Sequence, residues 1–225
     1  MNTACQASAI RCHALQWGPI GRPLTPPLDL DITSGTLTAV VGENGTGKTS
    51  LLRVLAGLQR PLAGRLDISL PRGAVTGFLQ QQQAIDRQFP INLGELVLAG
   101  LWGQRLPRPV RQARLDAALA AWQLDGLARY SLAELSGGQL QRALLARLSL
   151  LDAPLLLLDE PEASLDEAGQ RLLWRHLQAW QAEGKTLVMV CHDLASVRER
   201  AQWCLSIAPS ACQWQPGAAL RAVAC

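Results

Sequence analysis

The segment Gly42–Thr49, which reads GENGTGKT, constrains the fold of this chain more than any other feature. It follows the apolar run Leu37–Val41 and leads into a helical pattern that extends from Lys48 to Leu58. A continuous apolar strand favours burial on both faces, as in the parallel sheets of α/β proteins. The order of strand, glycine-rich loop and helix therefore predicts the start of an α/β unit.

The residue types in this loop predict that it binds the phosphates of a nucleotide. Glycines let backbone N–H groups turn toward phosphate oxygens, and the helix that follows adds its positive end. Lys48 is one of only two lysines in a chain with 21 Lys and Arg residues, and its compact ammonium suits the β- and γ-phosphates. Thr49 supplies a hydroxyl for Mg²⁺. The candidate ligands of the nucleotide are Gly42, Glu43, Asn44, Gly45, Thr46, Gly47, Lys48, Thr49 and Ser50.

A second apolar segment, Leu155–Leu158, leads directly into two acidic residues, Asp159 and Glu160. Ligands of open α/β sheets bind at the carboxyl ends of the strands, where this pair is expected to lie. We expect Asp159 to hold Mg²⁺, directly or through water, and Glu160 to polarise the water that attacks the nucleotide.

Residues 90–151 show no strand pattern and contain three helical segments instead. The third segment begins at LSGGQ, residues 135–139, where Ser136 is predicted to cap a helix whose first N–H groups are free to bind phosphate. This second candidate cradle consists of Ser136, Gly137, Gly138 and Gln139. One loop already serves one nucleotide, so a second cradle makes sense if it serves the nucleotide of another copy.

Together these motifs resemble those of the ATP-binding-cassette (ABC) ATPases, and the resemblance covers nearly the whole chain. It implies an α/β fold, that of a P-loop NTPase of the ABC type: a RecA-like core with an antiparallel β-subdomain and an inserted α-helical subdomain. Residues 1–225 would form a single domain, with 1–89 and 152–225 as the core and 90–151 as the helical part. The resemblance also implies hydrolysis of ATP, with Mg²⁺, by a head-to-tail homodimer.

The resemblance assigns roles to three further positions. Ala163–Asp166 resembles the D-loop, in which Asp166 would couple the two sites of the dimer. His192 resembles the switch histidine that senses the γ-phosphate. Trp17 is similar in placement to the aromatic residue that stacks on adenine.

A fourth position is the glutamine that, in the family, touches Mg²⁺ and the attacking water. The family usually reads Gly-Tyr-Val-Pro-Gln, which falls on Gly77–Gln81 and identifies Gln81 as this residue. Gln80 stands where proline is usual, and it is the alternative.

Composition bears on what such an ATPase would drive. The net charge is only +3 and no block of Lys and Arg is present, so nothing indicates a nucleic-acid partner. No apolar run reaches the roughly 18 residues of a transmembrane helix. The resemblance to ABC ATPases then implies a peripheral subunit at the cytoplasmic face of the inner (plasma) membrane, bound to integral-membrane permease subunits. A soluble ABC ATPase acting on nucleic acid or the ribosome is the alternative from another class.

The stretch after the glutamines resembles the ATPase subunits of zinc and manganese importers, at Asp86, Phe89–Pro90 and Val97–Gly100. This implies import of a metal ion, zinc first and manganese second, delivered by an extracytoplasmic metal-binding protein. An importer of an iron chelate or vitamin B12 and an exporter of haem, lipid or drug are the alternatives. The cassette does not touch the cargo, so no residue of the chain identifies it.

Overall fold

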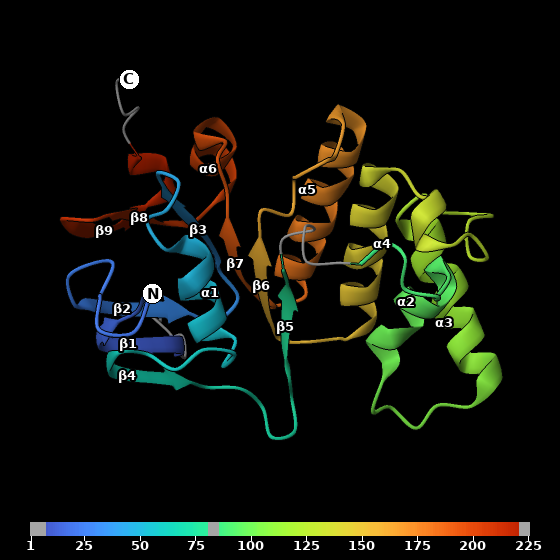
Figure 1. The fold of residues 1–225 in the computed structure, drawn as a ribbon, viewed down its shortest axis with the longest axis horizontal. Helices are drawn as coiled ribbons and strands as arrows, with labels where there is room; N and C mark the ends of the chain where they lie inside the picture. The colour runs from blue at the N-terminus through green and yellow to red at the C-terminus, as the bar shows by residue number, and fades with distance from the viewer. Residues whose placement is uncertain (1–7, 81–85, 221–225) are drawn as a thin grey trace, which may run out of the picture. The chain divides into compact units, whose positions relative to one another are not determined.

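The structure is a computed structural model that describes residues 8–80 and 86–220. Contacts among residues divide the chain into two compact units, whose elements are drawn in Figure 1. Unit 1 consists of Met1–Phe78, Pro154–Glu160 and Leu177–Cys225, and unit 2 of Leu79–Ala153 and Pro161–His176. These units are groups of residues in mutual contact, and the domain boundaries expected from the sequence remain a prediction.

Unit 1 is built on two β-sheets. The antiparallel sheet has the order β2-β1-β4 and comprises β1 (Ser8–Gln16), β2 (Leu28–Thr33) and β4 (Ala63–Ile68). The larger sheet has the order β5-β6-β7-β3-β8-β9. Its strands are β3 (Leu37–Gly42), β5 (Thr76–Leu79), β6 (Leu155–Asp159), β7 (Thr186–Val190), β8 (Trp203–Ala208) and β9 (Ala211–Pro216). Strands β6, β7, β3 and β8 pair in parallel, whereas β9 returns antiparallel to β8.

The central strands of the larger sheet are those with continuous apolar sequences. All residues of β6 and β7 are buried, and so are the first five of β3, which confirms the burial expected for Leu37–Val41. Strands β8 and β9 form an antiparallel hairpin at one edge of this sheet. The sequence did not reveal β4, because its residues are exposed or half-buried and show no apolar alternation.

The core of unit 1 contains side chains from both sheets and from helix α1 (Lys48–Leu55). Leu51, Leu52 and Leu55 of this helix are each at most 1% exposed. The helix ends before Gly57, whose φ of +72° favours glycine. Helix α6 (Leu194–Arg200) begins at an Asp193 cap and precedes β8. Helix α1, which starts at the glycine-rich loop, therefore packs in one core with side chains of both sheets.

Unit 2 is helical, as the sequence predicted. Its helices are α2 (Leu93–Leu98), the 3-10 turn η2 (Ala99–Leu101), α3 (Arg108–Ala121), the 3-10 turn η3 (Leu132–Glu134), α4 (Gly137–Leu150) and residues 167–176 of α5 (Glu167–Ala182). At Gly100 the turn after α2 meets α4 so closely that a Cβ would lie 2.2 Å from the Arg147 carbonyl oxygen. None of the helices described for residues 8–80 and 86–220 is long and apolar enough to cross a membrane.

His176 joins α5 to the end of α3 within unit 2. Its imidazole stacks on Trp122, with ring centroids 4.0 Å apart and an angle of 19° between the rings. Its Nε2–H donates to the Ala121 carbonyl oxygen at 3.0 Å. Burial lowers the pKa of His176 below its ordinary value of 6.5, and the bond to Ala121 acts in the opposite direction. The folded chain therefore favours the neutral imidazole.

A depressed histidine pKa makes stability depend on pH, because the unfolded chain then binds more protons than the folded one. We expect the contribution of His176 to be complete above pH 6.5 and to be lost as the pH falls below this value. The urea midpoint of the His176→Gln variant should consequently fall less than that of the wild type between neutral and mildly acidic pH. His13→Gln, at an exposed position, is the control and should keep the wild-type dependence. Parallel curves for the wild type and His176→Gln would contradict this prediction.

Candidate nucleotide-binding site

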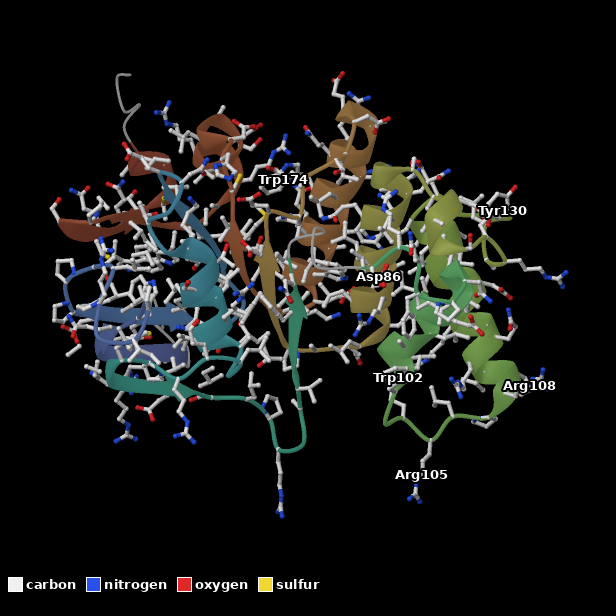
Figure 2. All side chains as sticks on the ribbon, in the orientation of Figure 1. Asp86, Trp102, Arg105, Arg108, Tyr130 and Trp174 are labelled. Atoms are coloured by element: carbon white, nitrogen blue, oxygen red, sulfur yellow. The ribbon has the colours of Figure 1, made fainter. Side chains whose placement is uncertain are left out.

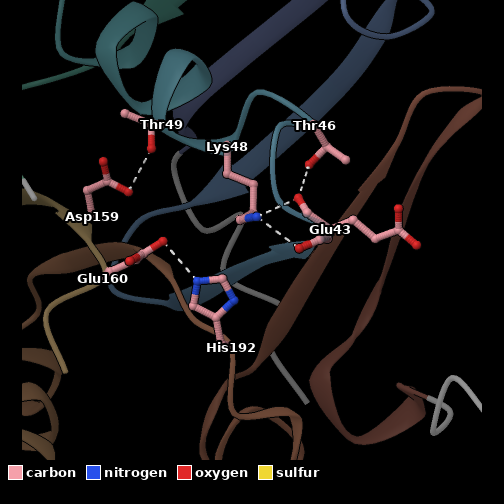
Figure 3. A network of polar contacts seen from close by, with 8 residues as sticks. Glu43, Thr46, Lys48, Thr49, Asp159, Glu160 and His192 are labelled. Atoms are coloured by element: carbon pink, nitrogen blue, oxygen red, sulfur yellow. Dashed lines mark hydrogen bonds and ion pairs between the residues drawn. The ribbon is translucent and has the colours of Figure 1, made fainter. Parts of the chain in front are cut away.

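The loop between β3 and α1 is held together by its own lysine (Figure 3). The Lys48 ammonium, with 6% of the residue exposed, donates to the carbonyl oxygens of Gly42 and Glu43 at 2.8 Å each. Thr46 Oγ1 donates to the same Glu43 oxygen at 2.9 Å. Burial lowers the pKa of the Lys48 ammonium, and the negative charges of Glu160 and Asp159 act in the opposite direction. An ammonium has three N–H groups, so a further acceptor such as a phosphate oxygen fits this position.

The rest of the loop faces solvent or begins the helix. Glu43, Asn44 and Gly45 are exposed, whereas Thr49 and Ser50 are half-buried in the first turn of α1. Gly47 stands at the N-cap with a φ of +92°, and a Cβ there would lie 2.6 Å from Leu24 Cδ1. Backbone conformation and packing both require glycine at this position, immediately before the lysine.

Trp17, which the family resemblance places beside adenine, is buried in this structure, and its stacking on a base stays a prediction. The residue is 0% exposed, and its Nε1–H donates to the Gly47 carbonyl oxygen at 2.9 Å. The chain after β1 turns back, because the Leu24 N–H donates to the Trp17 carbonyl oxygen at 3.0 Å. Trp17 belongs to the apolar core of unit 1, with Leu24 packed against that core. In this structure the indole supports the glycine-rich loop from below.

Asp159 and Thr49 form a set of oxygen atoms that fits a hard divalent cation. The Thr49 hydroxyl donates to Asp159 Oδ1 at 3.2 Å. The second carboxylate oxygen, Oδ2, is buried and has no hydrogen-bond partner among the residues that the structure describes. Burial raises the pKa of Asp159, against the effect of the Thr49 hydrogen bond. A cation would satisfy the orphaned oxygen and favour the charged carboxylate, so these residues suit Mg²⁺.

Glu160 and His192 are joined in the same unit, although 32 positions separate them. His192 Nε2 lies 2.8 Å from Glu160 Oε1, and the imidazole is about half exposed (Figure 3). Glu160 has a φ of +51°, a left-handed conformation that is uncommon outside glycine. Such backbone strain is frequent at functional sites. The pair can hold a carboxylate in a fixed direction, which is what the activation of a water molecule needs.

In unit 2, Ser136 caps α4 as predicted. Its hydroxyl accepts from the Gln139 N–H at 3.1 Å, and the Gln139 side chain accepts from the Ser136 N–H at 2.8 Å. The two glycines that follow have a packing role, because a Cβ on Gly138 would lie 3.0 Å from the Ser164 carbonyl oxygen and one on Gly137 would lie 3.3 Å from Ser164 Cβ. The loop 135–139, which we call the signature loop, and the segment 163–166 are thus in contact within one unit.

Two hydrogen bonds in unit 2 involve residues that the sequence did not single out. The buried amide of Gln141 donates to the Pro161 carbonyl oxygen at 2.9 Å, and the only signal in the sequence is a polar residue on the apolar face of a helix. Arg87 donates to the Leu135 carbonyl oxygen at 3.1 Å. The expected D-loop residue Asp166 accepts from the Gly169 N–H at 2.8 Å and so caps α5.

The glutamine expected to touch Mg²⁺ and water, Gln81, lies outside the described residues. Its alternative, Gln80, is the last residue described before the gap and is half-buried. The role of either residue therefore remains a prediction.

Comparison with known proteins identifies the family. The profile of the family described as ABC transporter matches residues 26–163. The zinc import ATP-binding protein ZnuC of Roseobacter denitrificans is 34% identical over 182 residues, which are 80% of this chain and 67% of that protein. The manganese transport system ATP-binding protein MntB of Bacillus subtilis is 32% identical, over 82% of this chain and 77% of that protein.

Solved structures have the same fold. A transporter described as of the metal-chelate ABC type, in an inward-facing conformation, has a TM-score of 0.80 and 27% identity, over 94% of this chain and 84% of that chain. The dimeric ATP-binding cassette MJ0796, bound to ADP and Pi, has a TM-score of 0.79 and 22% identity, over 92% of this chain and 98% of that chain. The second likeness bears on the fold alone. Both confirm the α/β P-loop fold of the ABC type that the sequence predicted. The chain belongs to the ABC transporter family, as an ATP-binding ATPase subunit.

Proposed function

We propose that this chain is the ATPase subunit of a metal-ion importer, with zinc as the first candidate cargo and manganese as the second. It would act as a homodimer on permease subunits at the cytoplasmic face of the inner membrane and receive cargo indirectly from an extracytoplasmic metal-binding protein. The observation that carries the ATPase site is that the Lys48 contacts of the loop, the Thr49–Asp159 bond and the Glu160–His192 contact all lie in unit 1.

ATP binding would begin at the glycine-rich loop. The loop N–H groups and the Lys48 ammonium would bind the β- and γ-phosphates, since the ammonium is already directed by two carbonyl oxygens. Thr49 and Asp159 would hold Mg²⁺. When bound, this ion would neutralise charge on the phosphate oxygens.

Hydrolysis needs a group that accepts a proton from water. In this proposal Glu160 takes the proton as the water oxygen bonds to the γ-phosphorus, and the bond to the ADP oxygen breaks. His192 would direct the Glu160 carboxylate through the contact at 2.8 Å and sense the γ-phosphate. ADP and inorganic phosphate would then leave.

A second copy would complete each site. Ser136, Gly137, Gly138 and Gln139 lie at the start of α4 and would face the ATP held by the partner. Asp166 would couple the two sites through the segment that packs against these glycines. ATP binding would close the dimer, and hydrolysis would reopen it.

Relatives support a metal cargo without defining which one. Relatives named for zinc and manganese systems are 32–34% identical to this chain, and the resemblance at Asp86 and Phe89–Pro90 supports the same class of cargo. A sulfate/thiosulfate import ATP-binding protein, CysA of Mesorhizobium japonicum, is 36% identical over 80% of this chain and 55% of that protein. The cargo therefore needs a direct test.

Lys48→Ala should weaken ATP binding roughly 10- to 100-fold, because a charge-assisted contact with phosphate is lost. Isothermal titration with ATP measures the change. Lys185→Ala is the matched control, since it removes the only other lysine, which pairs with Glu183 at 3.1 Å. Unchanged ATP affinity in Lys48→Ala would show that the loop is not the phosphate site.

Glu160→Gln should bind ATP normally but hydrolyse it about 100-fold more slowly or worse, because the proton acceptor is gone. The ATP-bound dimer should then persist, which size-exclusion chromatography with ATP detects. Glu162→Gln, two positions along the chain, is the control and should hydrolyse ATP at the wild-type rate. Turnover by Glu160→Gln at the wild-type rate would exclude Glu160 as the base.

Deletion of the gene should lower cellular zinc when external zinc is scarce. Elemental analysis by mass spectrometry should show restoration by the wild-type gene and none by the Glu160→Gln variant. If cellular manganese or iron falls while zinc is unchanged, that metal and not zinc is the cargo. The assignment of the ATPase site would not be affected. An unchanged content of all three metals would contradict metal import.

A further inference from the structure

Residues 96–115 of unit 2 carry positive charges only. Arginine recurs at every third position, Arg105, Arg108, Arg111 and Arg114, and no acidic residue occurs between Glu95 and Asp116. This segment holds four positive charges, whereas the whole chain has a net charge of only +3, so the rest of the chain is net negative by one. The spacing explains why no block of basic residues is evident in the sequence.

An exposed tryptophan precedes these arginines. Trp102 is 75% exposed, more than any other tryptophan in the part of the chain that the structure describes. Figure 2 shows Trp102, Arg105 and Arg108 at the same end of the helical unit, with Arg105 and Arg108 directed outward. We call Trp102 and the four arginines the Trp–Arg patch.

The backbone beneath the patch is held in place. Leu101, next to Trp102, is 2% exposed, and Gly100 packs against the α4 backbone. The Trp102 N–H donates to the Ala99 carbonyl oxygen at 3.2 Å, and the Gln104 N–H donates to that of Leu101 at 3.1 Å. A large aromatic side chain is thus presented to solvent by a hydrogen-bonded turn.

The charges of the patch have little compensation. Among the residues that the structure describes, no ion pair involves Arg105, Arg108 or Arg111. Arg114 donates to the neutral amide oxygen of Gln104 at 3.1 Å and keeps its charge. Asp116, the next acidic residue along the chain, accepts a hydrogen bond from Gln112. The surface therefore suits an anionic partner.

We propose that the Trp–Arg patch binds the surface of a bilayer that contains anionic phospholipids. Guanidinium groups pair with the phosphates of lipid headgroups, and an indole is favoured at the boundary between headgroups and acyl chains. The chain is a subunit of a membrane transporter by family, so a bilayer is the anionic surface nearest to it. This direct contact with lipid goes beyond docking on a permease and does not depend on the identity of the cargo.

Co-sedimentation of the full chain with vesicles tests the proposal without a permease. The chain should bind vesicles of phosphatidylcholine mixed with phosphatidylglycerol, and binding should weaken as salt is raised. Arg105→Gln with Arg108→Gln should lower the partition coefficient roughly 25-fold, at about fivefold for each arginine. Trp102→Ala should lower the partition coefficient as well. Brominated lipids should quench the tryptophan fluorescence of the bound wild type, and this quenching should be lost in Trp102→Ala.

A matched control lies in the same unit. Arg129→Gln with Tyr130→Ala removes one exposed arginine and one exposed aromatic residue, and Figure 2 shows Tyr130 away from Trp102, Arg105 and Arg108. This variant should bind the vesicles as the wild type does. Basal ATPase activity of all variants should stay at the wild-type level, which separates a failure here from a failure of the proposed ATPase site.

Three outcomes would overturn the proposal. One is equal binding to vesicles of phosphatidylcholine alone, and another is an equal loss of binding in the control variant. The third is a patch-dependent affinity for a single-stranded oligonucleotide with no binding to anionic vesicles, which would assign the patch to nucleic acid. Thermal melting of each variant verifies that its fold is retained.

Discussion

The contact of the Lys48 ammonium with two carbonyl oxygens of its own loop organises unit 1. It fixes the loop between β3, a central strand of the larger sheet, and α1, which packs between two layers of the core. Beneath the loop, Trp17 holds the Gly47 carbonyl oxygen, and that oxygen also accepts from the Leu51 N–H at 2.8 Å. The conformation of the loop is thus held by hydrogen bonds from its own lysine and from the indole of Trp17. Such preorganisation reduces the entropy lost when a ligand binds.

The start of α4 is likewise held in place by hydrogen bonds from its own side chains. Each of the first orphaned N–H groups of a helix needs a partner, and Ser136 and Gln139 satisfy two of them reciprocally. Gln141 then ties the same helix to the Pro161 carbonyl oxygen. Small residues at the start of the helix let the segment around Ser164 approach. A change in that segment would therefore be felt at the signature loop, through contacts that lie within unit 2.

The parts of the fold that the sequence predicted are those with local causes. Continuous apolar runs predicted β3 and β6, and a serine followed by glycines predicted the cap of α4. Strand β4 could not be predicted because its pairing with β1, and not its own pattern, makes it a strand. The candidate residues Lys48, Thr49, Asp159, Glu160 and His192 could be predicted from motifs, since their order along the chain is characteristic.

The burial of Trp17 could not be predicted, because the position of an aromatic residue in a sequence does not tell whether other residues cover it. The covering depends on how residues 18–24 turn back, and that turn is set by a backbone hydrogen bond and by the packing of Leu24. The bonds of Gln141 and Arg87 were equally invisible, because each joins residues that are distant in sequence.

The scarcity of lysine has a consequence for the chemistry of the surface. Lys48 is 6% exposed, and the side chain of Lys185 is 14% exposed, so the residues that the structure describes present almost no side-chain amine to solvent. Positive charge on the exterior is carried by guanidinium groups, which keep their proton at any physiological pH. Acylating reagents and acetyl-transferring enzymes consequently find few acceptors on this part of the chain. If an amine-selective reagent labels the chain and ATP suppresses the labelling, the reactive amine is that of Lys48 in the glycine-rich loop.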